Sequence, residues 1–221
     1  MTRIHSLAAA ALVVIALPLS GQTLASTGPA PAAAPLAPPT NLPPIPGMRQ
    51  FTHWGQVEST YDESENSSSV SLRLPFDDTQ RGVFIRRGVM RAVEMSTGYV
   101  FPGKTATAYP EVMTVVLKFT RPTDVALRSD REGTGDMAIY VDGGVPLVVP
   151  GPLVSRNGVD IVGGRARYVE DTYIVVLSLA QFLKVVNGAQ VDAQLHDIRM
   201  EFTGGPLEAM RDLASHLQLA P

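Results

Sequence analysis

The amino-acid sequence predicts a mainly β protein, an antiparallel β-sandwich with two short amphipathic α-helices near the C-terminus. Short apolar or alternating runs recur about every ten residues and are separated by glycine, proline and aspartate, which is typical of sandwiches and barrels. Apolar residues at helical spacing occur late, at 179–186 and 207–217. With 45% hydrophobic and 18% charged residues in 221, the chain can form a domain-sized core.

Residues 1–25 are predicted to be a signal peptide. A basic start that includes Arg3 precedes the apolar run Leu7–Leu17, which is too short to span a bilayer comfortably. Pro18 and several small residues follow, as they do before a cleavage site. An uncleaved N-terminal anchor is the alternative. Cleavage would leave a mature chain without a membrane span, and we expect a periplasmic or secreted bacterial protein.

Residues 26–47 are rich in alanine and proline and are predicted to be a disordered linker. Such a composition cannot bury a core and favours extended polyproline-type conformers. The segment fits a tether across an envelope layer, a spacer without a further role, or a PxxP ligand. Residues 48–221 then form a single β-sandwich domain.

The first part of this domain is expected to be strands joined by turns. The runs that predict strands lie at 70–74, 83–85, 89–95, 112–119, 125–128, 137–141, 145–149, 159–162 and 165–169. The run 112–119 has the clearest pattern of a central strand, and Gly98 is expected to end the strand before it. Asp142-Gly143-Gly144 and Gly163-Gly164 predict two hairpin turns, because aspartate and glycine tolerate positive φ.

The stretch that follows predicts a strand and then a helix. Tyr173–Leu177 is an unbroken β-branched and aliphatic run, which fits a strand buried on both faces. Ser178 can cap the helix, and Gly188 is expected to end it in a left-handed conformation. The apolar stripe of this helix is Leu179, Phe182, Leu183 and Val186. Lys184 points away from the stripe.

A hairpin and a closing helix complete the chain. Alternation at 191–195 and 198–202 predicts two half-buried strands joined at His196-Asp197. Pro206 fits the first position of the last helix, where its missing N–H costs nothing. The apolar face of that helix is Leu207, Met210, Leu213, Ala214 and Leu217. Its polar residues Glu208, Arg211 and Asp212 are expected to face water.

Composition and motifs exclude several classes of protein. The formal net charge of -3 and the pI of about 5.8 do not indicate a nucleic-acid partner. The absence of cysteine excludes disulfides, thiolate metal sites and a cysteine nucleophile. The sequence contains no HExxH, GxSxG, P-loop or GxGxxG motif, so we predict no cofactor and no catalytic constellation.

The loop 130–136 is the best candidate for a site with chemistry. Asp130, Glu132 and Asp136 lie among glycines, and three carboxylates could bind a calcium ion through hard oxygen ligands. A solvated loop in which Arg131 pairs with a carboxylate is the alternative. The same acidic residues could serve a hydrolase, since paired carboxylates perform acid–base chemistry.

Two further groups allow a functional and a structural interpretation. His196 beside Asp197 could relay protons, or could form a hairpin turn. The aromatic residues Trp54, Tyr61, Tyr99, Phe101, Tyr109, Tyr140, Tyr168 and Tyr173 could form the sugar-stacking platform of a carbohydrate-binding module. Ordinary packing is the alternative, because tyrosine and tryptophan combine an apolar body with a polar tip.

Several segments of the second half resemble an uncharacterised secreted bacterial β-sandwich family. The resemblance rests on Ile139–Gly143, on Val175–Leu177 with the helix Leu179–Val186, on Ile198–Phe202, and on Leu207–Ala214. It covers about 110–217 and consists mostly of core positions. It implies the sandwich fold and implies no catalytic residues.

The sequence therefore favours an exported, non-enzymatic domain with a binding or structural role in the bacterial cell envelope. Its partner would be a protein or another envelope component, bound in part through exposed strand edges. A hydrolase that uses residues 130–136 and a carbohydrate-binding module are the alternatives.

Overall fold

The computed structural model describes residues 42–47, 50–76, 92–123, 135–195 and 198–217. The strands are β1 Gln56–Asp62, β2 Ser67–Phe76, β3 Ala92–Pro102, β4 Val112–Pro122, β5 Asp136–Val141, β6 Leu147–Pro150, β7 Leu153–Val162, β8 Arg165–Ser178, β9 Val191–Leu195 and β10 Ile198–Phe202. The helices are α2 Leu179–Asn187 and α3 Gly205–Ser215. Within these residues the predicted mainly β architecture with two amphipathic helices is confirmed.

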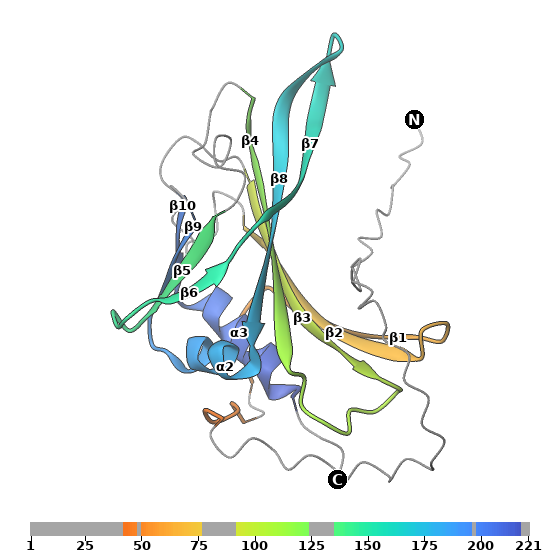
Figure 1. Ribbon diagram of the computed structural model, residues 1–221, viewed down its shortest axis with the longest axis vertical. Helices are drawn as coiled ribbons and strands as arrows, with labels where there is room; N and C mark the ends of the chain where they lie inside the picture. Colours follow the sequence, from red (N-terminus) through yellow and green to blue (C-terminus); the bar gives the residue numbers. More distant parts are fainter. Residues whose placement is uncertain (1–41, 48–49, 77–91, 124–134, 196–197, 218–221) are drawn as a thin grey trace, which may run out of the picture. The chain divides into compact units, whose positions relative to one another are not determined.

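The strands form two antiparallel sheets. One has six strands in the order β1-β2-β3-β4-β8-β7, and the other has four in the order β10-β9-β5-β6. The central position predicted for 112–119 is confirmed, because β4 lies between β3 and β8. Figure 1 shows the four-stranded sheet and both helices on the same side of the six-stranded sheet.

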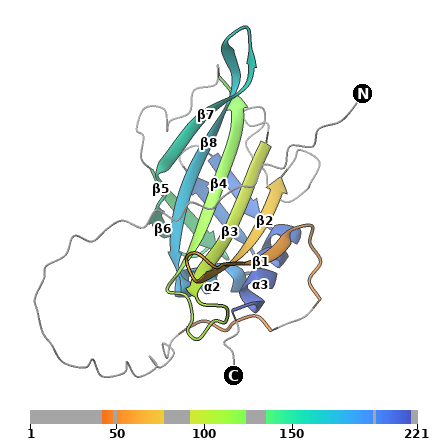
Figure 2. The ribbon, with the colours of Figure 1, turned by 90° about the vertical axis from the view of Figure 1, so that its right-hand side faces the viewer.

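One hydrophobic core joins both sheets and both helices. Along β4 buried and partly exposed residues alternate, so one face of the strand points inward. The core includes inward side chains of β4 and large side chains of both helices, among them Met113, Leu117, Phe119, Phe182, Leu183, Leu207, Met210 and Leu213, all 4% exposed or less. Figure 2 shows the helices behind the lower end of the six-stranded sheet. No helix in the described part of the chain is long and apolar enough to cross a membrane.

Helix α2 begins as predicted but ends differently. The Ser178 side chain accepts from the amide of Gln181, whose side chain accepts from the Ser178 amide, a reciprocal capping box. The predicted left-handed conformation of Gly188 is wrong, since its φ is -67° and its ψ is 149°. Glycine is required there for space, because a Cβ would lie 2.5 Å from the Val141 side chain.

Strand β3 does not end at Gly98 as the sequence predicts; it continues to Pro102. A Cβ at Gly98 would lie 2.5 Å from the carbonyl oxygen of Val70 on β2. The missing side chain therefore allows the two strands to approach, which is a second reason for glycine within a strand.

Strand β8 is longer and less buried than predicted. The runs 165–169 and 173–177 belong to one strand, and Val176 is 48% exposed. Burial on both faces is therefore wrong. The outward face of the six-stranded sheet also leaves Val112 48% exposed. An aliphatic run thus marks a strand correctly without revealing how many of its faces are covered.

Part of the segment expected as a linker contacts the core. Leu42 and Ile45 are partly buried against it. The Asn187 side-chain amide donates to the Pro44 carbonyl oxygen at 2.7 Å. The packed region, as far as the structure describes it, therefore begins before residue 48.

Candidate binding surface

The β7–β8 hairpin projects beyond the other strands of its sheet (Figure 1). The pairing of β8 with β4 ends where Tyr168 lies opposite Pro122, and the pairing with β7 continues to Val162 opposite Arg165. The turn at Gly163 and Gly164 has φ angles of 58° and 78°, which confirms the predicted glycine hairpin. We call Val159–Arg167 the hairpin tip.

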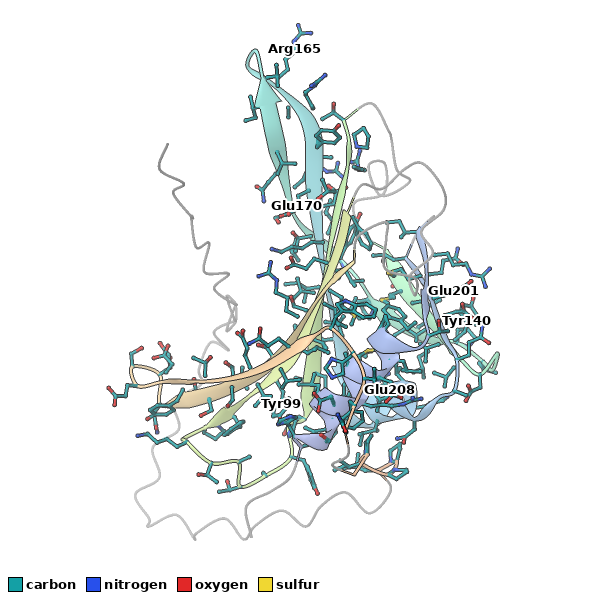
Figure 3. All side chains as sticks on the ribbon, turned by 180° about the vertical axis from the view of Figure 1, so that it is seen from behind. Tyr99, Tyr140, Arg165, Glu170, Glu201 and Glu208 are labelled. Atoms are coloured by element: carbon teal, nitrogen blue, oxygen red, sulfur yellow. The ribbon has the colours of Figure 1, made fainter. Side chains whose placement is uncertain are left out.

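The hairpin tip exposes aliphatic and basic side chains. Ile161 is 65% exposed and Val162 is 55% exposed. Arg165 and Arg167, on the returning strand, are exposed as well. Figure 3 shows Arg165 at the far end of the hairpin and Glu170 nearer to the body of the sheet. The tip therefore offers apolar contact area and positive charge to solvent.

An ion-pair cluster around a buried carboxylate holds the base of the hairpin. Asp171 on β8 is 0% exposed and faces inward. Its Oδ2 accepts from Arg121 Nε at 2.9 Å, and its Oδ1 accepts from Arg156 Nε at 2.5 Å. Because Arg121 lies on β4 and Arg156 on β7, one carboxylate joins three adjacent strands. Buried charges persist in a fold when they are paired in this way.

The sequence alone does not reveal this cluster. Arg121 and Arg156 are 50 and 15 positions away from Asp171, so no local spacing links them. The available signal is that Asp171 lies two residues before Tyr173 on the same strand, so both side chains point to the same face, and that of Tyr173 is buried. A charge on the inward face of a strand needs a partner, but parity does not identify it.

A second polar group joins the segment before β1 to α3. His53 Nε2 lies 3.1 Å from Asp212 Oδ2, and His216 Nε2 lies 3.7 Å from Asp212 Oδ1. Trp54 lies against Gly205, where a Cβ would be 2.1 Å from the ring. Among the described residues no group of three or more histidine and acidic side chains could hold a metal ion. These contacts fasten the segment to the helix.

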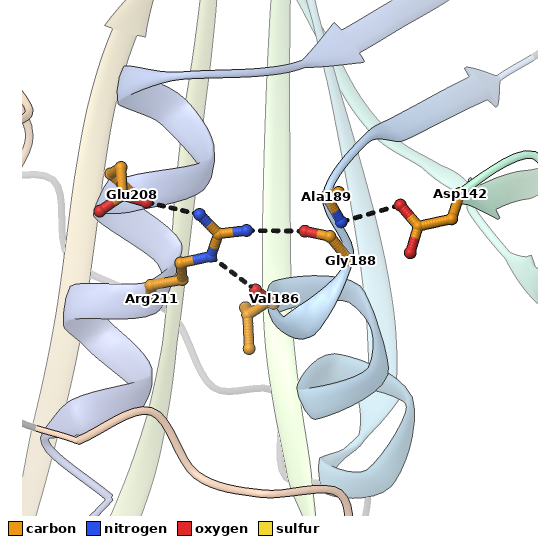
Figure 4. Close-up of polar contacts among 6 residues, drawn as sticks. All are labelled: Asp142, Val186, Gly188, Ala189, Glu208 and Arg211. Carbon is orange, nitrogen blue, oxygen red and sulfur yellow. Dashed lines mark hydrogen bonds and ion pairs between the residues drawn. The ribbon is translucent and has the colours of Figure 1, made fainter.

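Arg211 has a structural role that corrects the prediction that it faces water (Figure 4). Its Nε donates to the Val186 carbonyl oxygen at 2.8 Å, and its Nη2 donates to the Gly188 carbonyl oxygen at 2.7 Å. Nη1 pairs with Glu208 on the same helix. The guanidinium therefore caps carbonyl groups at the C-terminal end of α2, where a cation is favoured.

The predicted acidic site is only partly within the described residues. Asp130 and Glu132 lie outside them, as do His196 and Asp197. Asp136 is the exposed first residue of β5. The calcium loop, the acidic hydrolase site and the proton relay therefore remain predictions.

The aromatic residues do not all reach the surface. Tyr99 is 5% exposed and Tyr173 is 0% exposed. The Tyr173 ring packs edge-on against Phe119, with 5.7 Å between the centroids. These two tyrosines cannot stack on a sugar, so they do not belong to the proposed platform. Figure 3 also shows Tyr140 and Tyr99 in different regions of the molecule.

No protein-family model, curated protein or solved structure matches the chain.

Proposed function

We propose that this chain is an exported, non-enzymatic binding module of the bacterial cell envelope and that the hairpin tip is its contact surface. The observation that carries the proposal is the exposure of Ile161 and Val162, 65% and 55%, on a hairpin that projects beyond its sheet. Exposed apolar side chains on a protruding element gain stability when a partner removes them from water. The predicted signal peptide at 1–25 supports the envelope location.

The base of the hairpin supports the same function. The ion pairs of Asp171 with Arg121 and Arg156 fix β7 and β8 against β4. A surface held in one orientation loses less conformational entropy on binding than a mobile loop. The cluster therefore orients the tip.

Capture from a cell-envelope fraction tests the proposal. The full chain with a C-terminal tag is compared with the double variant Ile161→Asp and Val162→Asp, and the melting temperature confirms that both are folded. Val145→Asp is the matched control, since Val145 is 85% exposed but follows the other glycine turn.

We expect an envelope component that the wild type and the Val145→Asp control retain and the tip variant loses. Equal retention by the tip variant would show that the tip is not the contact surface. A screen of ester, glycoside, phosphate and peptide substrates completes the test, and turnover of any of them would show an enzyme instead.

A further inference from the structure

We propose that the hairpin tip docks on an anionic lipid bilayer, with Ile161 and Val162 entering the interface and Arg165 and Arg167 binding lipid phosphates. This inference rests on the proposed function and names the class of its partner. The two pairs of residues support it independently.

The apolar pair is placed for insertion. Ile161 and Val162 directly precede the glycine turn, so they lie at the end of the hairpin that is farthest from the core. Apolar side chains of peripheral proteins enter the headgroup region by about 5–10 Å. A projecting tip can reach that depth before the body of the domain meets the headgroups.

The basic pair is placed for phosphate binding. Arg165 and Arg167 are exposed on the strand that leaves the turn. The tip contains one acidic residue in sequence, Asp160, so its formal charge is positive although the whole chain carries -3. Guanidinium groups bind phosphate oxygens in bidentate fashion, and anionic surfaces attract such local charge.

Two observations favour a lipid surface over a protein partner. A stable protein interface usually covers about 800 Å² on each side, contributed by some 20–30 residues, which the short tip cannot supply. Strand addition along β7 is disfavoured by the register shift between Leu153 and Ser155 and by the inward Arg156, both of which protect sheet edges. A bilayer requires neither a large contact area nor a free strand edge.

Vesicle binding tests the inference. The full chain is sedimented with vesicles of equal parts phosphatidylglycerol and phosphatidylcholine, and with vesicles of phosphatidylcholine alone. We expect weak partitioning that requires phosphatidylglycerol and falls as salt rises from 50 to 500 mM, because screening weakens the attraction of the arginines. Equal binding to both vesicle types would overturn the role of the arginines.

Variants separate the two parts of the surface. Arg165→Gln and Arg167→Gln should each lower partitioning about fivefold, as expected for one cation at an anionic surface. Arg199→Gln is the matched control, because the Arg199 side chain is 65% exposed on β10. Ile161→Asp with Val162→Asp should abolish binding, and Val145→Asp should not change it.

Fluorescence reports insertion directly. The only tryptophan of the chain is Trp54, so a Val162→Trp variant adds one new signal. We expect its emission to shift to the blue with anionic vesicles and to be quenched by brominated lipid. An unchanged spectrum with bound protein would contradict insertion.

The remaining outcomes distinguish this inference from the function on which it rests. No vesicle binding, together with tip-dependent capture of an envelope protein, would overturn the lipid partner and support the binding module. A dimer in solution that the tip variant disrupts would assign the surface to a second copy of the chain. Failure of both vesicle binding and tip-dependent capture would overturn both proposals.

Discussion

The two parts of strand β8 bury inward side chains of different chemistry. Toward α2, its inward residues Tyr173, Val175 and Leu177 are all 3% exposed or less and join the hydrophobic core. Toward the hairpin, the inward residue Asp171 is equally buried but is a carboxylate that binds two arginines. One end is held by apolar packing, and the other by paired charges.

This difference shows that the surroundings of a position in the sheet, and not the strand pattern, decide whether a buried inward side chain is apolar or charged. Beside the helices, inward side chains meet other apolar side chains and gain stability from leaving water. At the base of the hairpin, Asp171 is stabilised by two guanidinium groups from β4 and β7. At the hairpin end, the free energy of unfolding should therefore fall when a charge is removed. At the end beside the helices, it should fall when apolar volume is removed.

One of the two largest effects should follow from Asp171→Asn at the hairpin end. The substitution keeps the volume and removes the charge, so Arg121, 3% exposed, loses its ion pair with Asp171. We expect the free energy of unfolding to fall by about 3–5 kcal/mol, as when one partner of a buried pair is removed. Urea denaturation measures it, with Asp136→Asn, at an exposed aspartate, as the control. A loss under about 1 kcal/mol, typical of surface pairs, would contradict the charge-held base.

Phe182→Ala tests the apolar end. Phe182 is 1% exposed on α2, so its removal should lower the free energy of unfolding by about 3–5 kcal/mol. This loss should not change with salt concentration, because no charge is removed. Lys184→Ala is the control on the same helix and should cost less than about 1 kcal/mol, because Lys184 is exposed. Equal small losses in urea would mean that the assigned helix face is wrong.

Arg211→Ala removes a charge from the apolar end and sharpens the contrast. It removes donors to the carbonyl oxygens of Val186 and Gly188. We expect a loss of about 1.5–3 kcal/mol, the range for hydrogen bonds to charged groups. Arg211→Lys should restore only part of this stability, because an ammonium group lacks the planar, forked donors of a guanidinium group. Full recovery in thermal melts would show that charge alone matters.

The smallest effect concerns Tyr99, which donates to the His216 carbonyl oxygen at 2.9 Å. Burial raises the pKa of the Tyr99 phenol to about 12. The pKa of Tyr99 is higher in the folded than in the unfolded protein. Its contribution to the free energy of unfolding is therefore complete below pH 10 and is lost as pH rises toward 12. Ultraviolet titration should show a late tyrosine that Tyr99→Phe removes, with a cost of about 1 kcal/mol below pH 10. No late transition in the wild type would contradict the buried phenol.

The sequence predicted most of the fold because its signals are local. Ser178 and the apolar stripe of α2 identified that helix, and glycines identified the two hairpin turns. Gly98 misled because its role depends on Val70, a residue on the neighbouring strand. Val176 misled because periodicity does not report which sheet face is covered.

The candidate surface was less predictable than the fold. The hairpin 159–169 was expected, but its projection depends on where β4 stops pairing with β8, which no local pattern encodes. The charges at its base come from three strands. The acidic loop stood out in the sequence because its residues are neighbours, whereas the tip is defined by exposure.

The contact between Trp54 and Gly205 has a consequence for natural variation. Any side chain at position 205 would collide with the indole, at 2.1 Å for a Cβ. The two positions should therefore covary. In a set of orthologues, a bulkier residue at 205 should occur only together with a smaller one at 54. Independent variation at the two sites would show that the Trp54 ring can pack in another position.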